Sequence, residues 1–345
     1  MRFWLTLASV AVVAGCSAAE EPIEGQSADL TACAPSSAPA VVGSPKIDHR
    51  AFDHLKSNLA AHLGGANHRG RDVLTTVGEP QWILAKFAYG LADKDLEDER
   101  VDVFVDRQGK WETLGSARTG RGDERAGLDG VEGVADGGGR LFFRIPEAQR
   151  LPVGRHRVRL VVHGDGSSAD VLVDVLPKNA PVVVSDVDGT LTSSESAEFP
   201  ALLTGSLPAA RPDAAAVLQT LAKKGYRVTY ITARAERLGD RTHAFLAANG
   251  FPEGPVHTST SALGLSGDAA ATFKTDELKR LESHGVRIAW GFGNTESDTR
   301  AYDAAAIEPR DHRVFLQFAD THGGRRIEAY ADLLPTLSAV PAVCR

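Results

Sequence analysis

The run Asp186–Thr190, Asp-Val-Asp-Gly-Thr, constrains the fold of this 345-residue chain more than any other segment, because it directly follows a short hydrophobic run. Side chains at positions i and i+2 of an extended chain point the same way, and glycine lets the backbone turn sharply beyond them. Such a pair can divide phosphoryl transfer: Asp186 attacks phosphorus, and Asp188 protonates the leaving alkoxide and later activates water. Taken alone, the five residues also fit a structural Asp-rich turn.

From residue 178 to the end, hydrophobic runs and helical patterns alternate. The strand patterns are VVVSDVD, RVTYITA and RIAWGFG, and helices are predicted to begin near Pro212, Ala235, Thr275 and Thr295. This alternation is typical of a doubly wound parallel sheet, whose functional groups gather at the carboxyl ends of the strands. We therefore expect an α/β domain over residues 178–345.

Two further elements fall at the same predicted edge. Thr232 ends one strand, where its hydroxyl and the following helix N-terminus can hold a phosphoryl oxygen, although a threonine there is also a common helix cap. Lys274 can neutralise both Asp186 and the transferred group, although a lone lysine is usually a surface residue. The catalytic set is thus predicted as Asp186, Asp188, Thr232 and Lys274. The predicted substrate-binding residues are Gly189, Thr190, Ala233 and Arg234.

A magnesium site is predicted beside them. Asn294 and Asp298 follow the last of these strand patterns, and Mg²⁺ prefers oxygen ligands with several retained waters. The expected ligands are Asp186, the carbonyl of Asp188, and Asp298 with or without Asn294.

In this order the four elements resemble the motifs of the haloacid-dehalogenase superfamily. More closely, DVDGTLT at 186–192, YITARAERLGDRTHAFL at 230–246, FKTDELKRL at 273–281 and FGNTESDTRAY at 292–302 resemble the lipin phosphatidate phosphatases. They equally resemble the C-terminal domain of the retinal-degeneration-B class of phosphatidylinositol transfer proteins. The Gly-Asn pair at 293–294 departs from the acid of many superfamily phosphatases but is similar to lipins.

Upstream, short β-type runs with glycine-rich turns over residues 72–177 predict a small, immunoglobulin-like β-sandwich. Three of these segments, at 77–90, 99–105 and 161–177, resemble the β-rich region of the same transfer proteins. Before them, residues 47–71 are predicted to contain an amphipathic helix whose apolar residues dock on the body. Those residues are Phe52, Leu55, Leu59 and Leu63. A membrane-surface helix is the weaker alternative, because the polar face is not strongly basic.

The resemblance implies a division between enzyme and binder. Lipins dephosphorylate phosphatidate with Mg²⁺, whereas the animal transfer-protein domains lack the first catalytic aspartate and only bind phosphatidate. This chain retains Asp186 and Asp188, which indicates a Mg²⁺-dependent phosphomonoester hydrolase acting through an aspartyl phosphate, with phosphatidate or a similar phospholipid as substrate. A phosphatase of soluble phosphomonoesters stays open, because only the short segment 193–211 separates the first motif from the next helix. A phosphatidate-binding protein without activity is the alternative from another class.

The N-terminus predicts export. One arginine, a short apolar run and Val13-Ala14-Gly15-Cys16 are typical of a bacterial lipoprotein signal over residues 1–16, with Cys16 lipidated and residues 17–46 a flexible tether. An ordinary secretory signal cut nearby, with Cys16 incidental, and an uncleaved anchor are the alternatives. The expected location is a bacterial cell envelope, where Cys33 and Cys344 are free to pair or to remain thiols. A net charge of −7 offers no basic footprint for nucleic acid.

Overall fold

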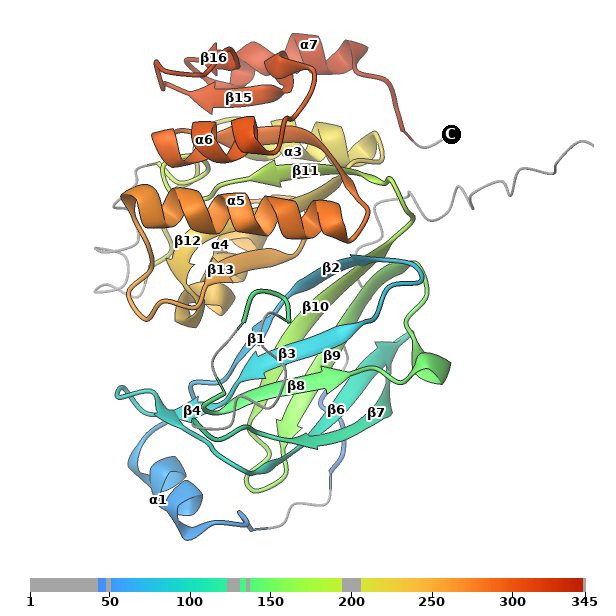
Figure 1. The fold of residues 1–345 in the computed structure, drawn as a ribbon, viewed down its shortest axis with the longest axis vertical. Helices are drawn as coiled ribbons and strands as arrows, with labels where there is room; N and C mark the ends of the chain where they lie inside the picture. The colour runs from blue at the N-terminus through green and yellow to red at the C-terminus, as the bar shows by residue number, and fades with distance from the viewer. Residues whose placement is uncertain (1–42, 48–50, 123–130, 135–136, 194–205, 344–345) are drawn as a thin grey trace, which may run out of the picture.

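The computed structural model describes residues 43–47, 51–122, 131–134, 137–193 and 206–343 as a mixed α/β structure. The predicted signal peptide and most of the predicted tether lie outside these residues, as do Cys16, Cys33 and Cys344. In Figure 1 an all-β part lies below an α/β part, and α1 (Leu55–Leu63) lies at the far end of the all-β part. Within the described residues, no helix has the length and apolar character needed to cross a membrane.

The all-β part contains two main sheets. The larger has the order β2 (Val73–Thr76), β10 (Ser168–Leu176), β9 (Gly154–Val162), β6 (Arg100–Arg107) and β7 (Lys110–Arg118). The smaller has the order β1 (Arg69–Arg71), β3 (Trp82–Lys86) and β8 (Arg140–Arg144). A short pair, β4 (Ala88–Tyr89) with β5 (Lys94–Asp95), adjoins them. All neighbours are antiparallel except β2 and β10.

Period-two patterning explains this packing. In β6, the alternate residues Val101, Val103 and Val105 are fully buried, because successive side chains of a strand point to opposite faces. They join one apolar core with Ile83 of β3 and Leu141 of β8, which belong to the smaller sheet. Residues of both sheets thus share one interior, as the predicted β-sandwich requires.

The helix α1 forms, but its leucines do not dock as predicted. Leu55, Leu59 and Leu63 are 87%, 59% and 78% exposed. The contact with the sandwich core is made instead by Ala60, Ala61 and the preceding Phe52, whose ring meets Tyr89 edge-on at 6.3 Å between centroids. The repeat of the leucines shows that they share a face, but it does not say which face meets the body.

The α/β part contains one six-stranded parallel sheet. Its order is β13 (Val256–Ser259), β12 (Arg227–Ala235), β11 (Pro181–Ser185), β14 (Arg287–Gly293), β15 (Arg313–Leu316) and β16 (Arg325–Ile327). The chain runs outward from β11 in one direction through β12 and β13, and then in the other from β14. The order of the strands therefore reverses between β11 and β14, where ligands bind in open α/β sheets.

Helices cover both faces of this sheet. The core of one face includes residues of α3 (Ala214–Lys223), α4 (Gly239–Ala248) and α7 (Leu334–Ala339). The core of the other includes residues of α5 (Gly267–Ser283) and α6 (Glu296–Ala304), and Figure 1 shows α5 and α6 in front of the sheet. The described residues also form four short 3-10 helices, η2 (Glu147–Gln149), η3 (Glu236–Leu238), η4 (Arg310–His312) and η5 (Tyr330–Leu333).

Two element boundaries differ from the prediction near the site. β12 continues to Ala235, so Thr232 lies inside the strand end, and α4 begins only at Gly239. Helix α5 was predicted to start near Thr275, just after Lys274. It begins at Gly267 instead, so Lys274 lies in its second turn with its side chain buried. Gly267 and Gly239 gave no sequence signal for a helix start, because glycine is a poor helix former.

The two parts of the chain share a core. Leu74 of β2 and Leu176 of β10 are fully buried in the same apolar cluster as Leu278 of α5. At this junction Thr76 donates a hydrogen bond to the carbonyl of His284, 2.5 Å away. The sandwich and the α/β part are therefore joined by packing as well as by the chain.

Candidate functional site

Asp186 lies at the carboxyl end of β11, next to β14, where the order of the strands reverses. Its backbone N–H donates to the carbonyl of Phe292 in β14 at 2.9 Å, which fixes the end of β11 against the neighbouring strand. Its side chain is 4% exposed. The predicted nucleophile is therefore held rigidly by the sheet.

Lys274 reaches two carboxylates from α5. Its Nζ lies 2.9 Å from Asp186 Oδ1 and 2.6 Å from Asp298 Oδ1, and all three residues are buried. Burial raises the pKa of Asp186 to about 7; the nearby charges of Asp298 and Asp188 also raise it, whereas Lys274 lowers it. Burial alone would lower the pKa of Lys274, but the two carboxylates raise it above its usual range.

Asp298 is bonded on both carboxylate oxygens. Oδ1 accepts from Lys274, and Oδ2 accepts from the N–H groups of Asn294 and Thr295, both at 3.1 Å, and from the Thr295 hydroxyl at 2.8 Å. The bond from the Thr295 N–H is one half of the capping box of α6, in which the Thr295 side chain in turn accepts from the Asp298 N–H. A Cβ at Gly293 would lie 2.4 Å from Asp298 Cβ, so glycine is required there. Asp298 therefore holds Lys274 and the loop in place.

Thr190 joins the two strand ends. Its hydroxyl lies 3.1 Å from Asp186 Oδ2 and 2.7 Å from Asn294 Oδ1, so it is shared between these oxygens. An Asp carboxylate and an Asn carbonyl are the kind of ligand that Mg²⁺ prefers. The buried carboxylates of Asp186 and Asp298 also outnumber the single buried ammonium of Lys274, and a cation would offset the surplus negative charge.

The residues present thus fit Mg²⁺, and their hydrogen bonding ranks them. Asp186 and Asn294, with the carbonyl of Asp188, are the better candidates for direct ligands. Asp298 was predicted in the same set, but its four protein donors favour a supporting position. No cluster of three or more His, Cys, Asp or Glu side chains able to hold a metal occurs among the described residues, so the candidate set depends on amide and backbone oxygens.

Asp188 is held by Arg234 and Thr232. The Arg234 guanidinium donates from Nη2 to Oδ1 at 2.7 Å and from Nε to Oδ2 at 2.8 Å, a two-bond pair of high geometric specificity. The Thr232 hydroxyl donates to Oδ2 at 3.2 Å. Arg234 was predicted to bind substrate, but in this structure its guanidinium contacts the proposed acid and base.

The remaining residues predicted to bind substrate are Gly189, in the turn after β11, and Ala233, near the end of β12. Gly189 has φ of +71°, in the left-handed region that favours glycine, and its N–H donates to the Thr192 hydroxyl at 2.9 Å. Ala233 is half-buried beside Thr232, and its carbonyl accepts from the N–H of Leu265 at 2.8 Å. The structure therefore brings all the predicted catalytic, substrate and metal residues of the α/β part to one edge of the sheet.

Sequence reasoning missed the support that the sandwich gives to this edge. Glu236, two residues after Arg234, accepts from Arg69 Nε at 2.9 Å and from both terminal nitrogens of Arg140 at 2.7 and 2.9 Å. Both arginines belong to the smaller sheet of the sandwich and are buried. No local pattern identifies such pairs, because their members lie 167 and 96 residues apart.

A second ionic cluster lies between the parts. Arg71 of β1 donates to Glu277 of α5 at 2.5 Å, and the other Glu277 oxygen lies 2.8 Å from His257 Nδ1. Burial alone would raise the pKa of Glu277, but Arg71, His257 and Arg280 hold it well below its usual range. The sandwich is thus tied to α5, the helix that carries Lys274.

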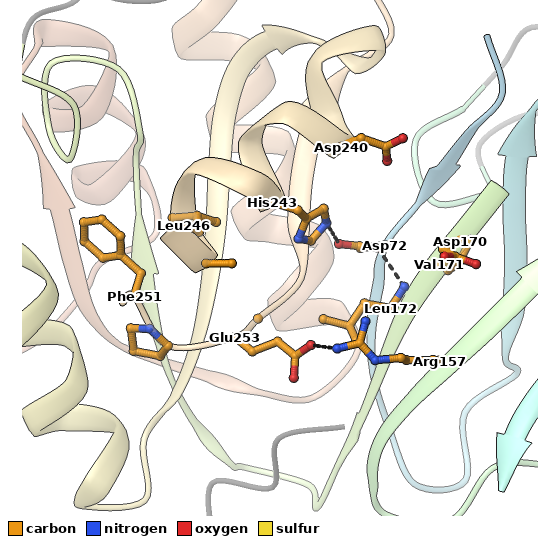
Figure 2. A pocket seen from close by; sticks show the side chains of 13 residues that line it. Asp72, Arg157, Asp170, Val171, Leu172, Asp240, His243, Leu246, Phe251 and Glu253 are labelled. Atoms are coloured by element: carbon orange, nitrogen blue, oxygen red, sulfur yellow. Dashed lines mark hydrogen bonds and ion pairs between the residues drawn. The ribbon is translucent and has the colours of Figure 1, made fainter. Parts of the chain in front are cut away.

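The cavity in Figure 2 also lies between the parts, but it is separate from the aspartate cluster. It measures about 500 Å³ and is bordered by β10 on one side and by α4 and the segment 251–254 on the other. Figure 2 shows His243 paired with Asp72, 2.8 Å apart, and Arg157 paired with Glu253. None of the predicted site residues lines it.

Comparison with known proteins identifies both parts. Residues 183–316 match the family model "PITM 1-3, LNS2 domain", and residues 66–125 and 130–175 match "PITM 1-3, beta-sandwich domain". The chain therefore contains a PITM-type β-sandwich followed by an LNS2-type domain. The second of these contains every predicted site residue from Asp186 to Asp298.

Several curated proteins match across both domains. Membrane-associated phosphatidylinositol transfer protein 2 of Homo sapiens is 32% identical over 78% of this chain and 18% of its own length. Protein retinal degeneration B of Drosophila melanogaster is 32% identical over 73% of this chain and 18% of its own length. Membrane-associated phosphatidylinositol transfer protein 1 of Rattus norvegicus is 29% identical over 83% of this chain and 21% of its own length. The chain thus spans about a fifth of the length of the curated relatives it matches.

These relatives correct the predicted location. We expected a lipid-anchored lipoprotein of a bacterial envelope, but the matched proteins named above come from eukaryotes, and two of the three are called membrane-associated. The expectation of a bacterial lipoprotein is therefore wrong. Among solved structures, a chitin-binding domain from Burkholderia pseudomallei aligns with 30% of this chain and 57% of its own at 12% identity and a TM-score of 0.18, too weak a likeness to support any argument.

Proposed function

We propose that this chain, with its PITM-type β-sandwich and LNS2-type domain, is a magnesium-dependent phosphomonoester hydrolase that acts on phosphatidate or a closely similar phospholipid. The observation that carries the proposal is the meeting of Asp186, Asp188 and Lys274 where the strand order reverses. A phosphatidate-binding role alone would not need a second aspartate held for proton transfer. The six-stranded parallel sheet with helices on both faces supports a haloacid-dehalogenase-like fold for the domain.

In the first half of the proposed reaction, an oxygen of Asp186 attacks phosphorus and the bond to the alcohol oxygen breaks. Asp188 transfers its proton to that departing oxygen, so that the alcohol leaves neutral and an aspartyl phosphate remains. Lys274, 2.9 Å from Asp186, stabilises the negative charge that builds up on the phosphoryl oxygens.

In the second half, Asp188 takes a proton from water, and the resulting hydroxide attacks the aspartyl phosphate. The bond between phosphorus and the Asp186 oxygen breaks, which releases phosphate and restores the carboxylate. The pairing with Arg234 and Thr232 orients the Asp188 carboxylate for this step. Arg234 must loosen one of its two bonds when Asp188 carries a proton, so it is proposed to alternate between Asp188 and the phosphoryl oxygens.

The chain's own oxygens would hold the metal ion at this edge. Asp186, Asn294 and the carbonyl of Asp188 are proposed as ligands, and Asp298 is proposed to support them through Lys274 and the loop N–H groups. When bound, Mg²⁺ would neutralise the charge that the nucleophile and the phosphoryl group bring together.

The proposed substrate class rests on two observations. The chain matches phosphatidylinositol transfer proteins, whose name specifies a phospholipid, over more residues than either domain contains. The motifs also resemble those of lipins. Phosphatidate carries the simplest phospholipid phosphomonoester, which is the group this arrangement of aspartates would hydrolyse.

The test uses the purified full chain with phosphatidate in mixed micelles and with soluble phosphomonoesters, each with Mg²⁺ or with a chelator. We expect phosphate release from phosphatidate that requires Mg²⁺ and disappears in Asp186→Asn, because an amide of the same size attacks phosphorus poorly. If the wild-type protein binds phosphatidate vesicles but releases no phosphate from any monoester with Mg²⁺, the enzyme proposal fails. Faster release from the soluble compounds would indicate a non-lipid substrate.

A further inference from the structure

Among the described residues, none covers the outward face of α1. Leu55, Leu59 and Leu63 recur every four residues and are all largely exposed, which places three large apolar side chains in a row on the solvent side. The opposite face of the helix, with Ala60 and Ala61, packs on the sandwich. A soluble surface does not usually expose a row of leucines, so such a row marks an interaction site.

The row continues into a groove between the two parts of the chain. The groove measures about 980 Å³ and is bordered by α1, the β4–β5 turn and η3. Leu63 lies on one side, Leu238 on another, and Leu91 projects from the turn with its side chain fully exposed. The apolar surface therefore extends from a helix of the sandwich part to the LNS2-type domain.

Two cations line the same groove. Lys94 of β5 and Arg237 of η3 are both exposed, and within the described parts of the chain neither has a hydrogen bond or ion pair through its side chain. This is unusual here, because other basic residues nearby are paired: Lys56 with Glu97, and Arg69 with Asp93. The helix α1 itself contains no acidic residue.

The groove adjoins the edge of the sheet where the aspartates lie. Arg237 follows Arg234, which holds Asp188, by three residues. On another side of the same strand end, Leu263 is 88% exposed in a loop whose Leu265 bonds to the carbonyl of Ala233. The cation Arg237 and the exposed Leu263 thus lie on chain segments next to the candidate site.

We propose that the leucine row of α1, Leu91 and the cations Lys94 and Arg237 form a docking surface for an anionic phospholipid bilayer. Apolar side chains that enter the boundary between headgroups and acyl chains, together with cations that meet lipid phosphates, are the combination by which a helix lies on a membrane. A protein partner with a hydrophobic groove would use the leucines but would not require unpaired cations around them. The proposal rests on the proposed function in one respect: the docked bilayer would supply the substrate.

Docking is tested with the full chain by co-sedimentation with vesicles of phosphatidylcholine alone and of phosphatidylcholine mixed with phosphatidylserine. Phosphatidylserine replaces phosphatidate so that surface binding is separated from recognition of a substrate. We expect binding to the mixed vesicles that weakens with salt. Replacing all three α1 leucines by glutamine should reduce it at least about tenfold, because the inserted apolar area is lost. Lys94→Gln and Arg237→Gln should each reduce it about fivefold.

Matched variants control for general effects. Val77→Gln changes another exposed apolar residue, and Lys110→Gln removes an exposed cation at the start of β7; neither should alter vesicle binding. The leucines are exposed, so their replacement should leave the melting temperature unchanged. Equal vesicle binding by wild type and the leucine variant, or an equal loss in the control variants, would overturn the proposal. Loss of self-association in place of vesicle binding would also overturn it.

Activity measurements separate this proposal from the enzyme proposal. If the enzyme proposal is right, the leucine variant should hydrolyse a soluble phosphomonoester at the wild-type rate but release less phosphate from phosphatidate in vesicles. Vesicle binding without phosphate release from any substrate would overturn the enzyme proposal and support docking. If the leucine variant releases phosphate from phosphatidate vesicles as fast as the wild type does, the enzyme proposal is supported and the docking proposal is overturned.

Discussion

Lys274 and Asp186 form a buried ion pair, with 2.9 Å between Nζ and Oδ1, although they lie on different elements of the LNS2-type domain. The same Nζ also contacts Asp298, so one ammonium serves two carboxylates. Asp298 also accepts hydrogen bonds from the loop, so its negative charge is better stabilised than that of Asp186. Burial accordingly raises the pKa of Asp186 to about 7.

Magnesium affinity should therefore depend on pH in the neutral range. A ligand carboxylate must be deprotonated to bind a metal ion, so below the Asp186 pKa of about 7 the affinity should fall by about tenfold per pH unit. Above that pH it should be constant. Isothermal titration with Mg²⁺ between pH 5.5 and pH 8.5 (roughly one and a half units either side of that pKa) checks this. Asp186→Asn should abolish the pH dependence; a flat profile for the wild type would contradict it.

Lys274→Ala should destabilise the fold as well as stop turnover. It leaves two buried carboxylates without their ammonium, a loss of about 3–5 kcal/mol for a buried pair that has lost one partner. The loss should be smaller at pH 5.5, where Asp186 can hold a proton. Thermal unfolding at pH 5.5 and pH 8 (about the range in which this carboxyl titrates) measures it. Lys279→Ala, an exposed lysine on the same helix, should change neither property.

Asp188→Asn should slow turnover in a way that depends on the leaving group. An amide cannot protonate the departing alcohol, and general acid catalysis is typically worth about 10²- to 10⁴-fold. The rate of aspartyl-phosphate formation should fall far less with p-nitrophenyl phosphate than with a phospholipid, because nitrophenolate leaves without a proton. Single-turnover rates with both compounds test this. An equal loss for both would show that Asp188 acts by another route.

Gly293→Ala should displace Asp298 without touching a catalytic group directly. The added Cβ would lie 2.4 Å from Asp298 Cβ and 2.8 Å from its Oδ2, inside any permitted contact. We expect at least about a tenfold loss of turnover, since misplaced supporting groups are costly in preorganised sites. Gly239→Ala is the matched control, because a Cβ there meets nothing within 4 Å. Wild-type rates in Gly293→Ala would show that the loop adapts.

Glu277→Gln should remove an acid-sensitive part of the stability. The pKa of Glu277 lies below its ordinary value of 4.5 in the folded protein, so its contribution is present above pH 4.5 and is lost as the pH falls below that value. We expect the variant to be less stable than wild type at pH 7 by about 3–5 kcal/mol. The two proteins should converge as the pH drops below 4.5. Urea unfolding across this range provides the measurement, with Asp276→Asn as an exposed control.

The sequence predicted the parts of the site that depend on local spacing. Asp186, Asp188 and Asn294 follow strands, and the carboxyl ends of parallel strands meet at one edge, so their proximity could be predicted. The partner of each charge could not, because pairing depends on how distant elements pack. Arg234 therefore looked like a substrate residue but bonds to Asp188. Likewise, periodicity placed the leucines of α1 on one face but could not say that this face points outward.

The shared core and ion pairs between the sandwich and the LNS2-type domain bear on how such proteins can be rearranged in evolution. Separating the two would expose Leu74 and Leu176. It would also leave Glu236 without Arg69 and Arg140, and Glu277 without Arg71. A recombination event that moved one domain alone would thus produce an unstable product. The pair should be inherited as a single block, and the human relative aligns with this chain over 273 residues, more than either matched domain contains.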